Sequence, residues 1–380
     1  MDLDLSDEHL SLRQSVREFA EKEIWSVAGD MDEKGECSAE VLSRMAGIGL
    51  LGMRTPKEYG GIGADMLSYA VAAEELGRAD VSTAMIMEVT NSLVCYPLRH
   101  FGTEDQKQEW LAPVAQGRIL GAFGLTEPGA GSDAAATSTS AVLEGDHWVI
   151  NGNKQFISLA GAEQTAFVIA IAATGKRDDG KKELSTIIVP KGSSGYTMSA
   201  PNRKLGVRAL DNRQLYFDSC RVPAENLLGQ RGAGLRQLLA ALDEGRIAYA
   251  AIAVGAAQRC LDMASKYAKD RLQFGRPLFE FQALQFRLVD MAVSIEHARL
   301  MCWKAAFLAD NGRPYTKEAA MAKLFATEMA TRAVETAIQV HGGYGYMEEN
   351  PLCRFYRDIK LFSIGEGSSE IQRLVIARYV

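Results

Sequence analysis

Five short segments of the sequence hold residue types that can do chemistry, and four of them set glycines beside those residues. The last of them, residues 364–373 (IGEGSSEIQR), places a carboxylate between two glycines. Glycine lets the backbone lie close to a ligand because it carries no side chain, and a carboxylate can serve as a general base. Surface turns often have the same composition, so this segment alone leaves both interpretations open.

Two further segments combine hydroxyls with small or flat side chains. In residues 125–133 (LTEPGAGSD), Thr126 and Ser132 stand in a glycine-rich stretch that would let the backbone approach a flat or anionic ligand. A plain loop between domains has the same composition. In residues 155–158 (QFIS), an aromatic lies two positions before a hydroxyl, which puts both on one face of a strand. That face could stack an isoalloxazine ring and hydrogen-bond its edge; alternatively, Phe156 belongs to the core.

Two more segments follow long helical stretches. Residues 270–278 (DRLQFGRPL) hold two arginines and an aromatic residue at a turn, which indicates either pyrophosphate binding or an ordinary corner between helices. Residues 339–346 (QVHGGYGY) contain a pair of glycines. A glycine after a helix commonly ends it, and the pair also bares backbone N–H groups for a ligand.

The elements that must position these segments form three regions. The first third of the chain is predicted to be helical, with Ser6 and Ser38 as N-terminal caps of two helices. The middle holds several short strands, and the Asn-Gly turn at residues 151–153 predicts a β-hairpin between residues 147–150 and 155–158. Closely spaced short strands favour a compact β module.

Residues 229–380 are predicted to return to helix. One helix has apolar residues at spacings of four and three, which predicts a single buried face. The residues of this face are Leu284, Leu288, Met291, Ile295, Ala298, Cys302 and Ala305. A turn at residues 310–314 precedes the next helix, which Thr316 can cap and which runs until the glycine pair.

Composition and charge exclude several classes of protein. The 380 residues carry 42 basic and 48 acidic side chains, a net charge of −6, and 47% of them are hydrophobic. These values are typical of a globular protein and argue against disorder. They also argue against nucleic-acid binding as the main activity, which needs a basic surface. No apolar run reaches the ~18–20 residues of a membrane span, and residues 1–8 lack the features of a signal peptide.

The sequence lacks the motifs of several common sites. It has no Rossmann or P-loop glycine pattern and no G-x-S-x-G nucleophile motif. Its six cysteines are scattered and its five histidines do not cluster, so we expect no disulfide framework and no metal site. A reducing, cytoplasmic compartment is the expectation. No pair of carboxylates stands out from the surface charge.

Taken in order and spacing, the five segments resemble those of the acyl-CoA dehydrogenase family, most of all its bacterial short-chain (butyryl-type) members. The resemblance extends over essentially the whole chain. It implies a mainly α fold with a central β domain: an N-terminal α-helical domain (residues 1–118), a central β-barrel or sandwich domain (residues 119–228) and a C-terminal four-helix bundle (residues 229–380). It also implies FAD as cofactor, an acyl-CoA substrate, a homotetramer and electron-transferring flavoprotein as electron acceptor.

The resemblance carries residue roles with it. Glu366 matches the catalytic glutamate, and Gly245 stands near Arg246 where some relatives place the base instead. The family's W-I-T motif is Phe156-Ile157-Ser158 here, two conservative departures. The implied flavin-binding residues, some acting across a subunit interface, are Phe123, Leu125, Thr126, Ser132, Phe156, Ser158, Arg271, Gln273, Phe274, Gln282, Gln339, Gly342, Gly343, Ser368 and Glu370. The implied substrate-binding residues are Ser132, Asp243, Gly245, Arg246, Gly365 and Gly367.

The implied reaction is an α,β-dehydrogenation of the thioester. Glu366 would take the pro-R α-proton as general base, and burial is expected to raise the pKa of its carboxyl group. The backbone N–H of Glu366 and a ribityl hydroxyl of the flavin would hydrogen-bond the thioester carbonyl and stabilise enolate charge. Flavin N5 would accept the β-hydride.

Two glycines suggest the shape of the acyl group. Gly365 stands where many members of the family have tyrosine, and Gly245 is equally small. If both leave open volume, a short acyl group that is branched or cyclic near the thioester would fit. The alternatives are an acyl-CoA oxidase, a dehydrogenase of acyl-carrier-protein thioesters, or a non-enzymatic binding protein. A basic C-terminal segment would support the last, and residues 377–380 (ARYV) do not form one.

Overall fold

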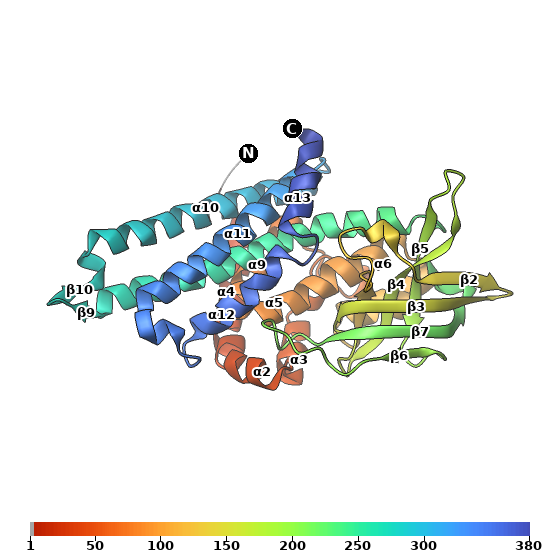
Figure 1. The fold of residues 1–380 in the computed structure, drawn as a ribbon, viewed down its shortest axis with the longest axis horizontal. Coiled ribbons are helices and arrows are strands. Elements are labelled where there is room, and N and C mark those ends of the chain that lie inside the picture. Colours follow the sequence, from red (N-terminus) through yellow and green to blue (C-terminus); the bar gives the residue numbers. More distant parts are fainter. Residues whose placement is uncertain (1–3) are drawn as a thin grey trace.

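The computed structural model describes residues 4–380, in which a helical region, a β-sheet and a second helical region follow one another along the chain (Figure 1). The N-terminal helices are α1 (Asp7–Phe19), α2 (Ala28–Lys34), α3 (Ala39–Gly47), α4 (Met66–Ala79), α5 (Val81–Glu88), α6 (Tyr96–Phe101), α7 (Glu104–Gln106) and α8 (Ala112–Ala115). The π-helical segments η1 (Ala20–Trp25), η4 (Val89–Cys95) and η5 (Lys107–Leu111) continue α1, α5 and α7. The order of the three regions is the predicted one.

One of the two predicted N-terminal caps is formed. The side chain of Ser6 accepts a hydrogen bond from the His9 backbone N–H at 3.3 Å, which satisfies one of the free N–H groups at the start of α1. Ser38 does precede α3, but its side chain caps nothing, and its backbone N–H points to the sulfur of Met31. The helix start was therefore predicted correctly and the capping role of Ser38 was not.

The central region is one mixed sheet of eight strands. The strands are β1 (Leu120–Gly124), β2 (Ser140–Glu144), β3 (His147–Ser158), β4 (Thr165–Lys176), β5 (Lys182–Pro190), β6 (Tyr196–Met198), β7 (Asn212–Pro223) and β8 (Leu227–Leu228). Their order is β6-β7-β3-β2-β4-β5-β8, with β1 parallel to β4. β1, which follows α8 in the chain, thereby lies beside β4 in the sheet.

The predicted hairpin at residues 151–153 is wrong. β3 runs straight through this Asn-Gly pair, and the side-chain oxygen of Asn151 accepts a hydrogen bond from the Ser219 backbone N–H of β7 at 2.8 Å. The tight turn lies earlier, at Gly145-Asp146, where Glu144 of β2 pairs with His147 of β3. Gly145 has φ +62°, the left-handed conformation that such turns require and that glycine adopts without strain.

The C-terminal region consists of three long helices and two short ones. They are α9 (Gly234–Asp270), α10 (Gln282–Asp310), α11 (Thr316–His341), α12 (Pro351–Ile359) and α13 (Ser369–Ile376), and β9 (Leu272–Gln273) pairs with β10 (Arg276–Pro277) between α9 and α10. The 3₁₀ turns are η2 (Leu50–Gly52), η3 (Lys57–Tyr59), η6 (Ala134–Ala136), η7 (Ala224–Asn226), η8 (Leu278–Glu280), η9 (Gly342–Tyr346), η10 (Lys360–Ser363) and η11 (Ala377–Tyr379). α9 packs against α10 and α11 and also against α4 of the N-terminal region.

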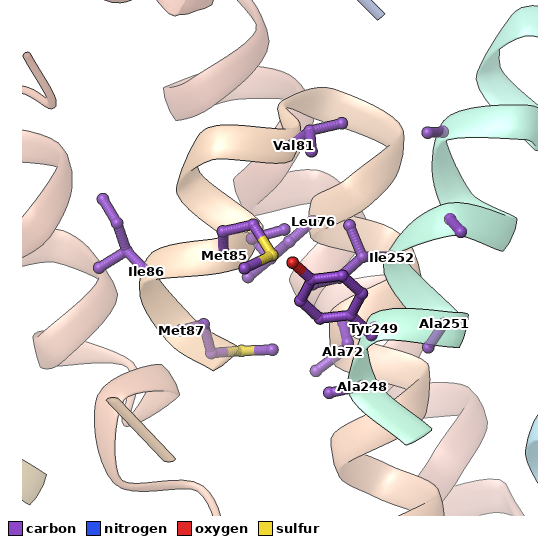
Figure 2. Close-up of a cluster of buried hydrophobic side chains, with 14 of the residues drawn as sticks. Ala72, Leu76, Val81, Met85, Ile86, Met87, Ala248, Tyr249, Ala251 and Ile252 are labelled. Atoms are coloured by element: carbon purple, nitrogen blue, oxygen red, sulfur yellow. The ribbon is translucent and has the colours of Figure 1, made fainter. Parts of the chain in front are cut away.

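Small residues allow α4 and α9 to pack closely. A Cβ atom at Gly77 would collide with the backbone of Ile252, and one at Gly255 would collide with the backbone of Glu74. The two helical regions therefore share one continuous core, in which Tyr249 of α9 projects among side chains of α4 and α5 (Figure 2). This shared core brings α5 to the middle part of α9.

The predicted apolar face of α10 is confirmed. Its six residues from Leu288 to Ala305 are buried, and Leu284 packs against the same core. Thr316 begins α11, but its hydroxyl donates to a carboxylate oxygen of Asp243 at 2.5 Å and does not cap the helix. Among residues 4–380, no helix combines the length and the apolar character that crossing a bilayer demands.

Candidate active site

Glu366 stands in a short loop that two other helices hold in place. The loop lies between η10 and α13, and Ser368 caps α13 by accepting a hydrogen bond from the Ile371 backbone N–H at 3.4 Å. The backbone oxygen of Gly367 accepts hydrogen bonds from Lys323 Nζ of α11 and from Gln372 Nε2 of α13, both at 2.8 Å. Glu366 is thus carried on backbone that is fixed from both sides.

The backbone of Glu366 adopts a conformation that side-chain-bearing residues rarely take. Its φ is +52°, in the left-handed region. Such a conformation costs on the order of 1–3 kcal/mol and persists where the surroundings enforce it, often at functional sites. The conformation turns the side chain inward, and both carboxylate oxygens are buried.

A second buried carboxyl group meets Glu366. Glu88, at the end of α5, has no exposed surface, and its carboxyl group lies close enough to that of Glu366 for each to shift the pKa of the other. No paired-carboxylate motif stands out in the sequence, so the pair was not predicted. The two residues are far apart in the chain and meet because α4 and α5 pack against α9 beneath the Glu366 loop. Glu88 and Glu366 are called the carboxylate pair below.

Burial governs the protonation of the carboxylate pair. Loss of hydration raises the pKa of Glu366, while the neighbouring Glu88 carboxyl group and the charges of Lys323 and Arg246 oppose that rise. Burial, followed by the charge of Glu366, raises the pKa of Glu88 much further. Burial lowers the pKa of Lys323 to about 8, and the charge of Glu366 opposes that fall.

The open volume expected at the two glycines is absent. A Cβ atom at Gly365 would collide with the hydroxyl of Tyr249. A Cβ atom at Gly245 would lie 2.5 and 2.8 Å from the carboxylate oxygens of Glu366. The glycines leave room for Tyr249 and for the acid itself, so the volume argument for a branched or cyclic acyl group is wrong.

Asp243 and Arg246 form a partly buried ion pair on α9. Arg246 is 3% exposed and donates to Asp243 at 2.6 Å, and Asp243 accepts from Thr316 with its other oxygen. The Nε of Arg246 is buried without an acceptor. The charge of Arg246 reaches Glu366 and favours its ionised form.

The segment with Thr126 and the segment with Phe156 lie side by side. The Gln155 backbone N–H donates to the Thr126 backbone oxygen at 2.8 Å. Beneath them, buried Lys154 donates to the Leu125 backbone oxygen at 3.1 Å and to the Glu127 carboxylate at 2.7 Å. This buried ion pair fixes the loop against β3.

The Glu127–Lys154 pair is charged at neutral pH. Burial would raise the pKa of Glu127, but hydrogen bonds from Lys154, Ser138 and Thr139 lower it to about 2. Burial lowers the pKa of Lys154 to about 8. A buried pair held by this many hydrogen bonds fixes geometry more than it adds stability, and here it fixes the loop that carries Thr126.

Phe156 is presented to solvent and does not belong to the core. Between Lys154 and Ile157, β3 advances three residues while β7 advances two, from Leu215 to Arg213, so Gln155-Phe156 is a β-bulge. Phe156 has φ +63° and is 62% exposed, while Ile157 is buried.

A large aromatic ring held out by strained backbone fits a flat cofactor that stacks on it. Phe123 and Leu125, at the end of β1, and Ser158 of β3 are half-buried in the same region, and Ser132 is exposed.

A second group of predicted residues lies elsewhere. Arg271, Gln273, Gly342 and Gly343 line one pocket of about 490 Å³ near β9, together with Tyr344 and other residues of this turn. It is called the Arg271 pocket below. The guanidinium of Arg271 lies 5.8 Å from the centre of the Tyr344 ring. An arginine beside two glycines fits a phosphate group, because it offers paired donors next to free backbone N–H groups.

The Arg271 pocket and the Glu366 loop are not brought together within one chain. Arg246 and Arg271 are 25 residues apart along and just past α9, which corresponds to about 37 Å at 1.5 Å per residue. β9 and β10 mark one end of the molecule and the sheet with β3 lies at the other (Figure 1). Phe274, at the same end, is 93% exposed with φ +51°, and Gln282 and Gln339 are exposed as well.

Sequence reasoning missed Glu88, Lys323 and Tyr249. A signal for the first two existed: Glu88 is the one charged residue among residues 81–98, and Lys323 is the one charged residue among residues 319–327. A lone charge in a long apolar helix is costly unless it meets a partner, so each predicts a buried polar site. Tyr249 gave no comparable signal.

Three family models match the chain in succession. They are the acyl-CoA dehydrogenase N-terminal domain at residues 6–118, the middle domain at residues 122–220 and the C-terminal domain at residues 232–380. The predicted fold class and the resemblance are thereby confirmed. The individual boundaries at residues 118 and 228 stay predictions.

Known proteins match over the full length. The chain is 51% identical to the probable acyl-CoA dehydrogenase YngJ of Bacillus subtilis, over 100% of this chain and 99% of that one. Butyryl-CoA dehydrogenase from Megasphaera elsdenii has the same fold, with a TM-score of 0.95, 38% identity and coverage of 100% and 99%. A chain solved in a study of the electron transferring flavoprotein of Acidaminococcus fermentans gives a TM-score of 0.95, 41% identity and coverage of 100% and 99%.

Proposed function

The chain belongs to the acyl-CoA dehydrogenase family, and from that premise we propose that it converts a short-chain acyl-CoA to the 2-enoyl-CoA with FAD as cofactor and Glu366 as general base. The observation that carries the assignment of the base is the inward-turned, buried carboxylate of Glu366 on left-handed backbone. Gly245 faces it and has no acid of its own.

The chain's own residues prepare the proton transfer. FAD, when bound, supplies the acceptor for the β-hydride. Glu366 takes the α-proton, and burial brings its pKa nearer to that of a useful base at neutral pH. The backbone N–H of Glu366 is proposed to donate to the thioester carbonyl and stabilise the charge that develops there. Lys323 and Gln372 hold the loop that aims these two groups.

The remaining predicted residues are proposed to hold the cofactor and the CoA. Phe156 would stack on the flavin, with Ser158 at its edge and the loop of Thr126 and Ser132 beside it. Arg271 is proposed to bind a phosphate of FAD. The other residues proposed to contact FAD are Phe123, Leu125, Gln273, Phe274, Gln282, Gln339, Gly342, Gly343, Ser368 and Glu370. The other residues proposed to contact the substrate are Asp243, Gly245, Arg246, Gly365 and Gly367.

A second copy of the chain is proposed to complete the cofactor site. The Arg271 pocket is too far along α9 to reach a ligand stacked on Phe156 of the same chain. α10 also presents exposed apolar side chains at helical spacing, namely Phe286, Val289 and Val293. We therefore propose a homotetramer located in the cytoplasm, which passes electrons to an electron-transferring flavoprotein.

The acyl group is proposed to be short, because Tyr249 fills the space beside Gly365 and the Glu366 carboxylate fills the space beside Gly245. A branched or cyclic group stays a prediction that no longer has open volume to support it. Turnover of straight, branched and cyclic acyl-CoA thioesters with an artificial electron acceptor tests both statements. Turnover of butyryl-CoA at a rate equal to or above that of the ring and branched thioesters would exclude the branched or cyclic preference.

The same measurement tests the proposed function as a whole. Protein that binds FAD and dehydrogenates short acyl-CoA thioesters is expected. Colourless protein that takes up no FAD, or turnover of none of the thioesters, would contradict the proposal. Rapid reoxidation by air in place of electron-transferring flavoprotein would identify an oxidase, and activity on an acyl-carrier-protein thioester alone would identify a carrier-protein dehydrogenase.

A further inference from the structure

Glu88 is a buried titratable group beside the proposed base, and the proposed mechanism leaves it without a role. It is the last residue of α5, where the chain passes into the π-helical segment η4. The two ends of this stretch are fixed: Asp80 caps α5 by accepting from Thr83 at 2.8 Å, and the Asn91 side chain donates to the Leu50 backbone oxygen at 2.8 Å. π-helical turns inside helices frequently mark functional sites.

The carboxylate pair lacks any other source of hydrogen bonds. Both oxygens of Glu88 and both oxygens of Glu366 are buried, and among residues 4–380 no N–H or hydroxyl group donates to them. Buried acceptors in folded proteins are rarely left unpaired. One proton shared between the two carboxyl groups supplies the missing donor.

Three of the nearby donor groups are committed elsewhere, and the remaining one, Arg246 Nε, donates to neither carboxyl group. The Tyr69 hydroxyl is hydrogen-bonded with the Ser92 hydroxyl at 3.0 Å. Lys323 Nζ and Gln372 Nε2 donate to the Gly367 backbone oxygen. The pair is therefore self-sufficient: one member must carry the proton and donate it to the other.

The surrounding charges decide which member carries the proton. The positive groups of Lys323 and Arg246 favour the ionised form of Glu366. Glu88 is faced by Glu366 and by the carboxylate of Glu244, which both disfavour its ionised form. The proton therefore belongs to Glu88 and the negative charge to Glu366.

Other groups on the elements packed against α5 do not reverse this assignment. Burial raises the pKa of Tyr69 on α4 and of Tyr249 on α9, so both hydroxyls stay neutral. Arg354 on α12 lies 3.5 Å from Asp80, at the opposite end of α5 from Glu88. Glu244 is itself held by arginines, with Arg99 at 3.1 Å and Arg54 at 3.8 Å.

We propose that Glu88 is a positioning residue for the base: its neutral carboxyl group donates a hydrogen bond to the Glu366 carboxylate and keeps that carboxylate ionised in the ligand-free enzyme. This role rests on the proposed function of Glu366. Without the donor, Glu366 would lie in the same buried place with no hydrogen bond to its carboxylate, and only the charges of Lys323 and Arg246 would favour its ionised form. Its ionised fraction would then fall at any pH near or below neutrality.

Three variants separate this role from simple packing. Glu88→Leu removes the donor, Glu88→Gln keeps a donating N–H on a side chain of the same shape, and Met87→Leu is a volume-conserving control on the same helix. The readout is the rate of flavin reduction by butyryl-CoA in single turnover, measured against pH on the FAD-loaded enzyme. The acidic limb of this profile reports the ionisation of the base.

The expected result is a shift of the limb to higher pH in Glu88→Leu. At a pH on that limb the rate should fall on the order of tenfold, because a hydrogen bond to a charged group is lost. Glu88→Gln and Met87→Leu should lie near the wild type. An unshifted limb in Glu88→Leu, a limb that moves to lower pH, or a change in KM alone would each overturn the proposal.

A second readout needs no turnover. The infrared C=O stretch of a protonated carboxyl group, distinct from that of a carboxylate, should be present at neutral pH in the wild type. Asp358 is another buried carboxyl group, with a pKa raised to about 7, so each variant is compared with the wild type by a difference spectrum. The protonated-carboxyl intensity should fall in Glu88→Gln and be retained in Glu366→Gln. Equal intensity in the wild type and Glu88→Gln would overturn the proposal even if the enzyme turned over no thioester, so failure of this inference and failure of the proposed function are distinguishable.

Discussion

The carboxylate pair and the Arg271 pocket lie along the same helix, α9, and differ in how much of each site one chain supplies. Glu366 is surrounded by buried residues of α4, α5, α9 and α11, which all belong to the same chain. Around Arg271, a shallow pocket sits at the end of the molecule beside Phe274, which is 93% exposed (Figure 1).

The difference separates proton chemistry from cofactor binding. A buried base needs a fixed environment, because its pKa depends on each nearby charge and on the exclusion of water. A site for an extended cofactor can be divided between chains, because each part contributes its own contacts. Changes at the carboxylate pair should therefore alter rate and pH dependence, and changes at the Arg271 pocket should alter FAD affinity.

The largest expected effect is at Glu366. Glu366→Gln keeps the shape of the side chain and removes the base, so turnover should fall by roughly 10²–10⁴-fold. The FAD content of the purified protein, read from its visible absorbance, should be unchanged. Loss of FAD together with activity would show that Glu366 supports the fold of the cofactor site. It would contradict the proposed separation between proton chemistry and cofactor binding.

The next effect is at the other end of α9. Arg271→Gln removes a charged donor and should weaken FAD binding by roughly tenfold or more, since hydrogen bonds to charged groups contribute about 1.5–3 kcal/mol. The rate of flavin reduction in the fraction that still holds FAD should stay at the wild-type value. Arg276→Gln is the matched control, because Arg276 stacks on Phe281 at 4.1 Å and does not line the pocket. Equal FAD affinity in the two variants would contradict the phosphate role.

A double variant tests the closed space beside the base. Gly365→Ala should lower the free energy of unfolding by about 1–3 kcal/mol, because the new methyl group meets the Tyr249 hydroxyl. Tyr249→Phe removes that hydroxyl and should restore most of the stability in Gly365→Ala/Tyr249→Phe. Denaturant unfolding of the four proteins measures this coupling. A Gly365→Ala protein as stable as the wild type would mean that the space is open after all.

The smallest expected effect concerns pH. Because burial raises the pKa of Glu366, the base is ionised above that pKa, and activity should decline as the pH falls through it. Lys323→Met removes a positive charge that favours the ionised form, so the acidic limb should move to higher pH and the rate there should fall about a few-fold. A limb that stays in place would show that Lys323 acts only through its hydrogen bond to Gly367.

The sequence predicted features that depend on local pattern. The Ser6 cap, the apolar face of α10 and the order of the three regions all follow from spacing along one element. The Asn-Gly pair at residues 151–152 led to a wrong hairpin prediction, because this local pattern carries no information about the neighbouring strand. Here the Ser219 backbone N–H of β7 donates a hydrogen bond to the Asn151 side chain, and β3 continues as a strand.

The parts that escaped prediction depend on tertiary contacts. Glu88 meets Glu366 only because Gly77 and Gly255 let α4 and α9 pack closely. The space beside Gly365 was judged from the glycine alone, and Tyr249, distant in the chain, fills it. In both cases the deciding partner comes from another element, and no spacing within one segment reveals it.

The most direct test of the central claim is anaerobic rapid mixing of the FAD-loaded enzyme with butyryl-CoA that carries hydrogen or deuterium at the α-carbon. If Glu366 removes the α-proton, deuterium should slow flavin reduction in the wild type, and Glu366→Gln should bind the thioester and leave the flavin oxidised. Flavin reduction in Glu366→Gln at the wild-type rate, with the same isotope effect, would contradict the account.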